Sequence, residues 1–444
     1  MRNRTSSKVG LAAALIVSAG LAFSGCAVDQ PSAPEVTTGT IDFTTMSVIG
    51  NSLSAGVVNG GLGGFTQANS FPALIAGQVE TAFIQPAITD PGIPTKKQLV
   101  ITAQGPAIVD RSGEGIPTNT GYAGIYNNLA VPGATSVDVM SDDGSSAGTI
   151  SQVILRGQGT QVELAVASSP SIVFVWAGSN DVLGGALSGV VADGVTTVPI
   201  AATTASLTGL FTTLESQTTA EIVAANVPDV TTIPYVTYLS RGYTSPLTDD
   251  AGTQTVFPVI TTGTGTERQA TEDDYILLPA ATAFAMDPTL GQPTNPVPNE
   301  LVLDEAEITD LQSRVDAINS VIETQASSAG AILVDTHALM TEAAASPMTI
   351  TEGGVDYEIN SLFVSDGGMT FSLDGVHPTT AGYVMVANYF IDVLNQAPGA
   401  AIPHVSYSRT VFPRVAAEGK VALEKMPDFT GLQEHLMEIY GIRR

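Results

Sequence analysis

Short apolar runs alternate with longer amphipathic stretches along most of this chain. Four runs have the length of buried strands and are followed by turn residues, at positions 46–49, 171–176, 221–225 and 331–335. Apolar residues at spacings of three and four predict a helix over 303–328. A second helix is predicted over 379–395, with Pro378 just before its start and Asn395 at its end. Strands that alternate with helices indicate a parallel sheet with helices on both faces, so we expect a three-layer α/β/α domain.

The stretch from about 236 to 302 breaks this alternation, because it is rich in Thr, Gly and Pro. An irregular insertion of this length within a domain is typical of either a disordered segment or a cap over a functional site. We expect it to lie over the site, where its Thr, Ile, Leu, Phe and Tyr side chains could line a pocket. The predicted domain therefore spans 43–402, with this insertion inside it.

The first residues have the pattern of an export signal. Arg2, Arg4 and Lys8 precede an apolar run at 11–23, which is too short to span a bilayer, and small residues lead to Cys26. This pattern resembles a bacterial lipoprotein signal, which implies removal of residues 1–25 and acylation of Cys26. Residues 26–42 are rich in Pro, Thr and Ser and predict a flexible tether between lipid and domain. An ordinary secretory signal is the alternative.

The last segment, 403–444, differs in charge from the rest of the chain. Six basic residues lie beyond position 408, whereas the chain as a whole has 16 Lys and Arg against 43 Asp and Glu. This tail could form an amphipathic helix through Leu432, Leu436 and Tyr440, or it could remain a solvated tail.

Composition excludes several function classes. A formal net charge of −27 argues against nucleic-acid binding. The single Cys cannot form an internal disulfide, and no cluster of Cys and His predicts structural zinc. The acidic pairs at 142–143 and 249–250 are too short for a calcium loop. A mechanism that uses histidine has only four candidates.

Chemically active residues follow the predicted strands, where ligands of parallel sheets bind. The first strand leads into Asn51 and Ser52, and the second leads into Asn180. Gly133 lies in a turn between them, and Asp374-Gly-Val-His377 comes near the end of the domain.

These four blocks, in this order, resemble those of the SGNH/GDSL hydrolase family of esterases and lipases. The resemblance covers about 43–397 and implies a flavodoxin-like parallel sheet. It also implies a carboxylic-ester hydrolase that forms an acyl-enzyme and needs no cofactor and no metal ion. The implied partner is an ester substrate, either an acyl lipid or a small ester.

The resemblance assigns a role to each block. It makes Ser52 the nucleophile, His377 the general base and Asp374 the carboxylate that orients His377. The expected oxyanion donors are the backbone N–H groups of Ser52 and Gly133 and the side-chain amide of Asn180. The family usually has Asp where this chain has Asn51.

Other readings of single residues are less specific. His337 is the main rival base, but it lacks the context of a triad, and His404 and His435 are expected at the surface. Asp181 is expected to accept backbone hydrogen bonds, and Trp176 to lie in the core.

Two alternatives to an esterase or lipase stay open: a carbohydrate O-deacetylase of the same fold, and a surface lipoprotein that binds without catalysis. In either case we expect export and lipid anchoring at the bacterial cell envelope, at the outer membrane or cell surface. The sequence leaves the oligomeric state open.

Overall fold

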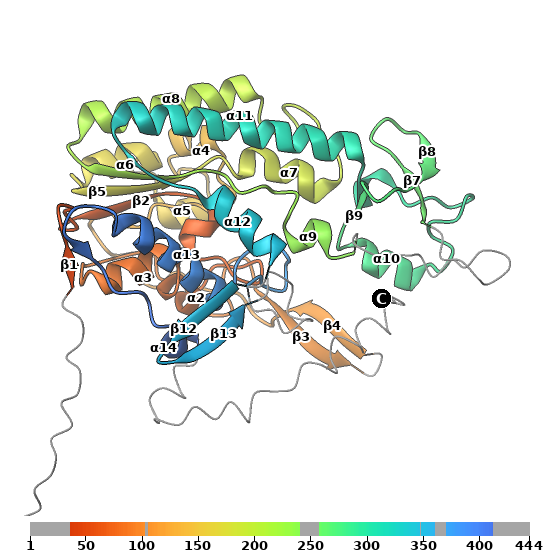
Figure 1. Ribbon diagram of the computed structural model, residues 1–444, viewed down its shortest axis with the longest axis horizontal. Coiled ribbons are helices and arrows are strands. Elements are labelled where there is room, and N and C mark those ends of the chain that lie inside the picture. Colours follow the sequence, from red (N-terminus) through yellow and green to blue (C-terminus); the bar gives the residue numbers. More distant parts are fainter. Residues whose placement is uncertain (1–35, 103–104, 240–256, 347, 360–369, 412–444) are drawn as a thin grey trace, which may run out of the picture. The chain divides into compact units, whose positions relative to one another are not determined.

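A parallel sheet forms the centre of the fold, where Figure 1 labels β2 and β5. Its four strands have the order β11-β6-β5-β2. The computed structural model describes residues 36–102, 105–239, 257–346, 348–359 and 370–411. The strands are β2 (Met46–Gly50), β5 (Ile172–Trp176), β6 (Glu221–Ala225) and β11 (Ile332–Val334). All four coincide with the predicted strands. Every position of β2 and β5 is buried, as expected for strands covered on both faces.

The register of the sheet brings the carboxyl ends of the strands to one edge. Gly50 pairs with Trp176, Val175 with Ala224, and Val334 with Ala225. A further extended segment runs beside β2, because Val48 donates to the carbonyl of Asn127. The loops that follow these strands therefore start next to one another.

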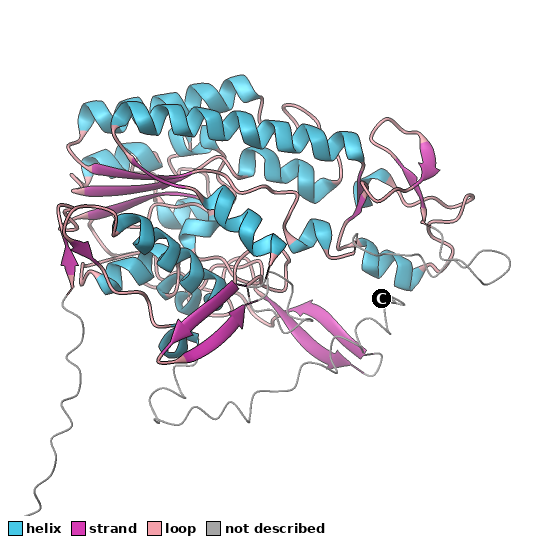
Figure 2. Ribbon diagram, viewed as in Figure 1, coloured by secondary structure: helices cyan, strands magenta, loops and turns pink. Residues whose placement is uncertain are grey.

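Helices cover both faces of the sheet (Figure 2), which confirms the predicted three-layer α/β/α architecture. One face is covered mainly by α8 (Ile200–Gln217) and α11 (Glu305–Ala329). The other is covered mainly by α3 (Phe71–Gln78) and α13 (Thr380–Leu394). The remaining helices of the body are α1 (Ser52–Ala55), α2 (Gly64–Ala68), α4 (Ser136–Ser141), α5 (Ile150–Ile154), α6 (Gln161–Ala167), α7 (Asn180–Ser188), α9 (Pro234–Thr237) and α12 (Thr336–Ala345).

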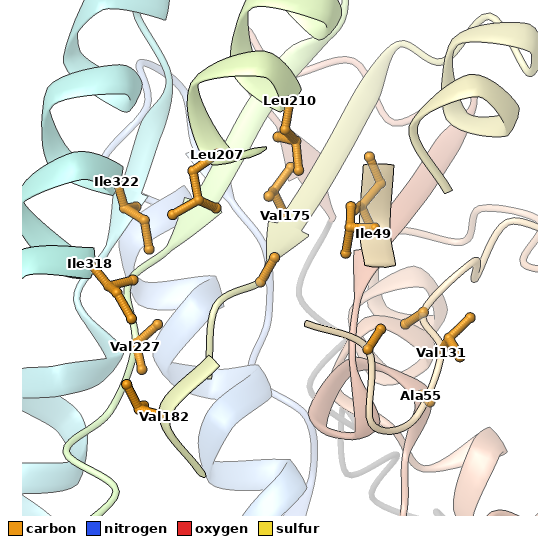
Figure 3. Packing of buried hydrophobic residues seen from close by; sticks show 14 of the residues in the cluster. Ile49, Ala55, Val131, Val175, Val182, Leu207, Leu210, Val227, Ile318 and Ile322 are labelled. Carbon is orange, nitrogen blue, oxygen red and sulfur yellow. The ribbon is translucent and has the colours of Figure 1, made fainter. Parts of the chain in front are cut away.

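Alternate strand residues supply two separate apolar cores, as the two-residue period of a strand requires. Figure 3 shows part of one core, with Ile49 and Val175 from the sheet, Leu207 and Leu210 from α8, and Ile318 from α11. The other core contains the intervening strand residues together with α3 and α13. The helical period predicted for 303–328 matches α11, whose N-cap Asp304 accepts hydrogen bonds from the N–H groups of Ala306 and Glu307.

The insertion is more ordered than its composition predicts. Its described part contains two antiparallel pairs, β7 (Val259–Thr261) with β8 (Glu267–Gln269) and β9 (Tyr275–Ile276) with β10 (Val302–Leu303). It also contains α10 (Ala280–Met286) and a short 3₁₀ helix at Asn299–Leu301. These elements share a small apolar cluster of their own, including Ile260, Phe284 and Val297, which explains why a Thr-, Gly- and Pro-rich segment folds.

Two hairpins lie outside the predicted elements. The first pairs β3 (Lys97–Thr102) with β4 (Gly105–Asp110), and the second pairs β12 (Met348–Glu352) with β13 (Val355–Ile359).

Short elements lie at both borders of the predicted domain. Near the start, β1 (Thr37–Thr38) pairs with β14 (Ala400–Ala401), so the end of the predicted tether belongs to the folded body. Near the end, α14 (Tyr407–Val411) packs on the body through the buried Tyr407, so the domain extends beyond residue 402. Backbone pairing holds the first segment, whereas α14 is held by the contact of Tyr407 with Tyr357 and by hydrogen bonds from Ser408 to Glu352. None of these contacts leaves a periodic pattern in the sequence.

Several predictions concern residues outside the described part of the chain. They include the leader at 1–25, the proposed acylation site Cys26, the acidic pair at 249–250, His435, and the tail helix through Leu432, Leu436 and Tyr440. Within the described part, no helix combines the length and the apolar character needed to cross a membrane.

Candidate active site

A pocket of about 870 Å³, counting its open mouth, lies beyond the carboxyl ends of the parallel strands. The segments that follow all four strands contribute to its wall, through Ser52 after β2, Asn180 after β5, Pro228 after β6 and Thr336 after β11. His377 lines the same pocket from the loop before α13. The fold therefore brings together residues that are more than 300 positions apart in the sequence.

Ser52 begins α1 immediately after the turn that ends β2. The turn is set by Asn51, whose side-chain Oδ1 accepts a hydrogen bond of 3.0 Å from the N–H of Leu53 and so caps the helix. Gly50 is required before it, because a Cβ there would lie 2.5 Å from Ser54 Oγ and 2.9 Å from the carbonyl of Trp176. Ser52 itself is 7% exposed and faces the pocket.

Asp374 and His377 form a hydrogen-bonded pair within one loop. The Nδ1 atom of His377 lies 2.8 Å from Asp374 Oδ2, and both side chains are largely buried. The other carboxylate oxygen accepts hydrogen bonds from the N–H groups of Val376 and His377, at 2.9 Å each, and from Ser372 Oγ. Burial alone would raise the pKa of Asp374, but the charge of His377 and these hydrogen bonds lower it to about 2. Asp374 is therefore a carboxylate at neutral pH and fixes the orientation of the imidazole.

Other parts of the fold hold this loop in place. The hydroxyl of Ser372 accepts a hydrogen bond from the N–H of Asn59, and Asn59 Oδ1 accepts one from the N–H of Leu373. The carbonyl of Gly375 accepts a hydrogen bond of 2.9 Å from the N–H of Tyr235. The loop that carries His377 is thus tied to the segment that follows the Ser52 turn and to α9.

Of the predicted oxyanion donors, Asn180 lines the pocket and Gly133 does not. Asn180 begins α7 and lines the pocket, and one of its two Nδ2 hydrogens is committed to the carbonyl of Ala134 at 2.8 Å. Gly133 precedes Ala134, has a positive φ of 83° and is exposed. Gly133 is outside the pocket lining, so the pocket contains Ser52, Asn180 and His377, with Asp374 behind His377.

The sequence model of the GDSL-like lipase/acylhydrolase family matches residues 48–390. The chain belongs to this family. No curated protein matches the chain in sequence.

Solved structures similar to this hydrolase include an esterase, a phospholipase and a lipase. An acetylxylan esterase from Geobacillus stearothermophilus has 13% identity and a TM-score of 0.36, over 80% of this chain and 95% of that one. A phospholipase A1 from Streptomyces albidoflavus has 15% identity and a TM-score of 0.33, over 80% and 99%. A lipase from Streptomyces rimosus has 15% identity and a TM-score of 0.34, over 80% and 99%.

The other His and Asp residues considered as catalytic candidates in this GDSL-like hydrolase have structural partners. His337 Nδ1 lies 3.3 Å from the carbonyl of Val227, and His404 pairs with the exposed Asp392 at 2.7 Å. Asp181 is fully buried and accepts hydrogen bonds from the N–H and hydroxyl of Ser136 and from the hydroxyl of Thr203, as predicted for a structural carboxylate.

Trp176 is in the core, as predicted, but it also lines the pocket. Among the described residues, no three His, Cys, Asp or Glu side chains are grouped so that they could hold a metal ion.

The apolar wall of the pocket comes from helices that the motifs did not indicate. On α12, Leu339, Met340 and Ala343 face the pocket, and on α13 Met385 and Val386 do the same. On α12, Leu339 and Met340 precede Ala343 by four and three residues, which places them on one face of the helix. On α13, Met385 and Val386 follow the pocket residue Gly382 by three and four residues. That spacing was readable in the sequence, but it is equally typical of a helix packed on a core.

The prediction that the insertion lines the pocket is wrong for its described residues. The lining residue nearest to it in sequence is Ile233, which precedes α9. The insertion instead touches the outer side of the His377 loop, where Leu278 Cδ2 would lie 3.2 Å from a Cβ on Gly375. Its apolar side chains are divided between its separate cluster and the main core, to which Leu277 belongs.

Proposed function

We propose that this chain is a serine hydrolase that cleaves carboxylic esters with an apolar acyl group. The observation that supports this proposal is that Ser52 and His377 line one pocket whose remaining wall is largely apolar. An apolar pocket with a few convergent polar groups is typical of a site for a partly apolar small molecule.

In the proposed reaction, Ser52 Oγ attacks the ester carbonyl while His377 Nε2 removes its proton. His377 must act through Nε2, because Nδ1 is bonded to Asp374. The negative charge on Asp374 stabilises the imidazolium that forms, and His377 then protonates the departing alcohol. Water, activated by the same imidazole, hydrolyses the acyl-enzyme and releases the acid.

The oxyanion of each tetrahedral intermediate would be bound by the N–H of Ser52 and the second Nδ2 hydrogen of Asn180, both of which line the pocket. The hydrogen bond between Asn180 and Ala134 supports this role, because it fixes the amide and leaves its second hydrogen available. The N–H of Gly133, the third donor that the family resemblance implies, lies outside the pocket lining.

The acyl chain would lie against the facing surfaces of α12 and α13. Burial of each methylene group stabilises the complex by about 0.8 kcal/mol, or roughly fourfold in affinity, as long as the chain stays within the apolar wall. Two methionines in this wall, Met340 and Met385, can adapt to chains of different shape.

The decisive experiment compares hydrolysis of nitrophenyl esters from acetate to palmitate, together with acetylated sugars. We expect activity to rise with acyl length and then to level off. Ser52→Ala and His377→Ala should abolish hydrolysis, whereas Ser54→Ala and His337→Ala serve as matched controls outside the pocket. A fluorophosphonate probe should label the wild type and the controls but not Ser52→Ala.

Two outcomes would contradict the proposal, and each would support a different function. Cleavage confined to acetyl groups, with sugars as the best substrates, would identify a carbohydrate O-deacetylase. A folded protein that neither hydrolyses any ester nor reacts with the probe would identify a binding lipoprotein.

We also propose that Cys26 is acylated and anchors the enzyme at the bacterial cell envelope. The basic start, the apolar run at 11–23 and the small residues before Cys26 support this. Cells grown with labelled palmitate should transfer the label to the wild type but not to Cys26→Ser. The variant should leave the membrane fraction, and a labelled Cys26→Ser protein would contradict the anchor.

A further inference from the structure

A two-residue turn at Asn59-Gly60 contacts the loop that carries Asp374. Val58 and Gly61 exchange backbone hydrogen bonds on either side of this turn, and both turn residues have a positive φ, 55° for Asn59 and 75° for Gly60. Asn-Gly is a preferred pair for such a hairpin turn, because both residues tolerate a left-handed backbone. The tip of the turn lies against the carboxylate, since a Cβ on Gly60 would be 3.9 Å from Asp374 Oδ2.

The turn orients a buried hydroxyl group toward the same carboxylate. The N–H of Asn59 donates a hydrogen bond of 2.9 Å to Ser372 Oγ, and Ser372 Oγ donates one of 3.1 Å to Asp374 Oδ1. Ser372 is 1% exposed, and its hydroxyl has a single hydrogen. Because the N–H of Asn59 approaches this oxygen as a donor, the hydroxyl hydrogen points away from Asn59 and toward Asp374.

The side chain of Asn59 makes a second contact with the loop. Its Oδ1 atom accepts a hydrogen bond of 2.9 Å from the N–H of Leu373, the residue between Ser372 and Asp374. A Gly at position 59 would allow the same turn, so the turn alone does not require this side chain. The carbonyl of Asn59 accepts a hydrogen bond of 2.8 Å from the N–H of Lys97, which ties the turn to the start of β3.

The turn belongs to the short segment that begins with the nucleophile. Val57, between α1 and the turn, donates its N–H to the carbonyl of Ser52 at 3.1 Å and accepts a hydrogen bond of 2.9 Å from the Tyr383 hydroxyl on α13. Asn59 and Ser372, in contrast, are 313 positions apart in the sequence. Residues 52–59 therefore contain both the nucleophile and the contacts that hold the loop of its Asp–His pair.

We propose that Asn59 and Ser372 are positioning residues of this hydrolase, which hold Asp374, and through it the imidazole of His377, in the orientation that serves Ser52. Neither residue lines the pocket, so both would act through Asp374 and not by contact with the substrate. The proposal rests on the proposed ester hydrolysis and extends the set of residues on which its rate depends.

Loss of these contacts would loosen Asp374 without removing it from the site. The N–H groups of Val376 and His377 would still donate to Asp374 Oδ1, and the N–H of Ser372 would still donate to the carbonyl of His377 at 2.8 Å. Loss of one hydrogen bond to a charged group is enough to lower a rate about tenfold. Substrate binding should change little, because the pocket wall stays intact.

The test measures kcat and KM on nitrophenyl octanoate for the full chain, per amount of folded protein determined by near-ultraviolet circular dichroism. Ser372→Ala removes the hydroxyl, whereas Asn59→Gly removes Oδ1 but keeps the N–H and the left-handed backbone. We expect kcat to fall about tenfold in Ser372→Ala and at least about threefold in Asn59→Gly. KM should stay within about twofold of the wild-type value, as for groups that act only on the transition state.

Two control variants match these changes away from the site. Ser169→Gly also places Gly at a position of positive φ, 50°, but at an exposed residue outside the pocket. Ser47→Ala also removes a buried hydroxyl, on β2 and outside the pocket lining. Both controls should keep the wild-type kcat and KM.

A second background separates positioning from a general structural effect. Asp374→Asn removes the carboxylate through which both residues would act. Adding Asn59→Gly or Ser372→Ala to Asp374→Asn should therefore change the residual kcat by less than about twofold, since effects that pass through one group are not additive. A residue with a purely structural role would lower kcat by the same factor in both backgrounds.

Unchanged kcat in Ser372→Ala and Asn59→Gly, with hydrolysis intact in the wild type, would overturn the positioning role alone. An equal fall in kcat in both backgrounds, or a rise in KM without a fall in kcat, would also overturn it. If one of the two variants does not fold, the other decides, because the two remove different hydrogen bonds. A wild type that hydrolyses no ester would overturn the proposed function itself.

Discussion

Replacement of Asp374 by Asn tests the role of the buried carboxylate with almost no change in shape. In the wild type, the N–H groups of Val376 and His377 donate hydrogen bonds to Asp374 Oδ1. The side-chain oxygen of an Asn can still accept both of these hydrogen bonds. The amide nitrogen, however, would face His377 Nδ1 as a donor. The imidazole would then carry its proton on Nε2 and could not remove the proton of Ser52. We expect kcat to fall by about 10⁴.

The pKa of Asp374 gives the size of the stability effect. Burial opposes the charge, but His377 and the backbone donors lower the pKa from 3.8 to about 2. A difference of one in pKa corresponds to about 1.4 kcal/mol, so the carboxylate contributes about 2 kcal/mol to the free energy of unfolding. Since the folded pKa is the lower one, this contribution is present above pH 3.8 and is lost as the pH falls toward 2.

The assay combines kcat on a nitrophenyl ester with urea unfolding at several pH values. Asp374→Asn should be about 2 kcal/mol less stable than the wild type at pH 7, and the difference should shrink below pH 3.8. Asp392→Asn is the matched control, because it disrupts a similar Asp–His pair on the surface, where ion pairs contribute little. An Asp374→Asn variant with kcat within tenfold of the wild type would refute the assigned role.

Further predictions address the oxyanion donor, the acyl wall, a buried acid and metal dependence. Asn180→Ala should lower kcat by about 10²–10³ with little change in KM, and an unchanged kcat would exclude Asn180 as an oxyanion donor. Ala343→Phe, which fills the α12 side of the pocket, should lower the ratio of kcat/KM for octanoate over acetate at least tenfold; an unchanged ratio would place the acyl chain elsewhere. Burial, together with the nearby carboxylate of Asp304, raises the pKa of Glu307 from 4.5 to about 7, so the wild type should lose stability as the pH rises from 4.5 to 7. Glu307→Gln should remove most of that loss, which urea midpoints at pH 5 and pH 8 would show. Hydrolysis should persist after dialysis against EDTA, and its loss would indicate a metal ion.

The main strands and helices were predictable because burial on both faces leaves a simple pattern. Residues 46–49 are followed by Gly50 and residues 171–176 by Ala177-Gly178, and these two apolar runs form β2 and β5. The helix α11 was predictable from its apolar stripe and its acidic N-terminus. The hairpin β12–β13 was missed because β12 alternates half-buried with exposed positions and lacks a continuous apolar run. In the hairpin β3–β4 the apolar runs are only three residues long, at 99–101 and 107–109.

The insertion is a region whose folded structure its sequence pattern does not predict. Its composition predicts an irregular segment, yet its described residues pack Ile260, Phe284 and Val297 into a cluster separate from the main cores. These residues are distant from one another in sequence and occur on short elements, so no period reveals that they meet.

The sequence by itself determined the order of the chemical blocks and the sheet that carries them. Local chemistry is enough for this, since a buried strand, a turn with Gly and a loop that holds Asp374 and His377 are each encoded within a few residues. Only the tertiary structure decided which residues surround Ser52. The parallel register brings the ends of β2 and β5 together, and α12 and α13 close the pocket with side chains that a sequence pattern cannot distinguish from core. It also left Asn51 Nδ2 and Ser179 Oγ without a hydrogen-bond partner among the described residues, because whether a buried polar group is satisfied depends on neighbours from every part of the fold.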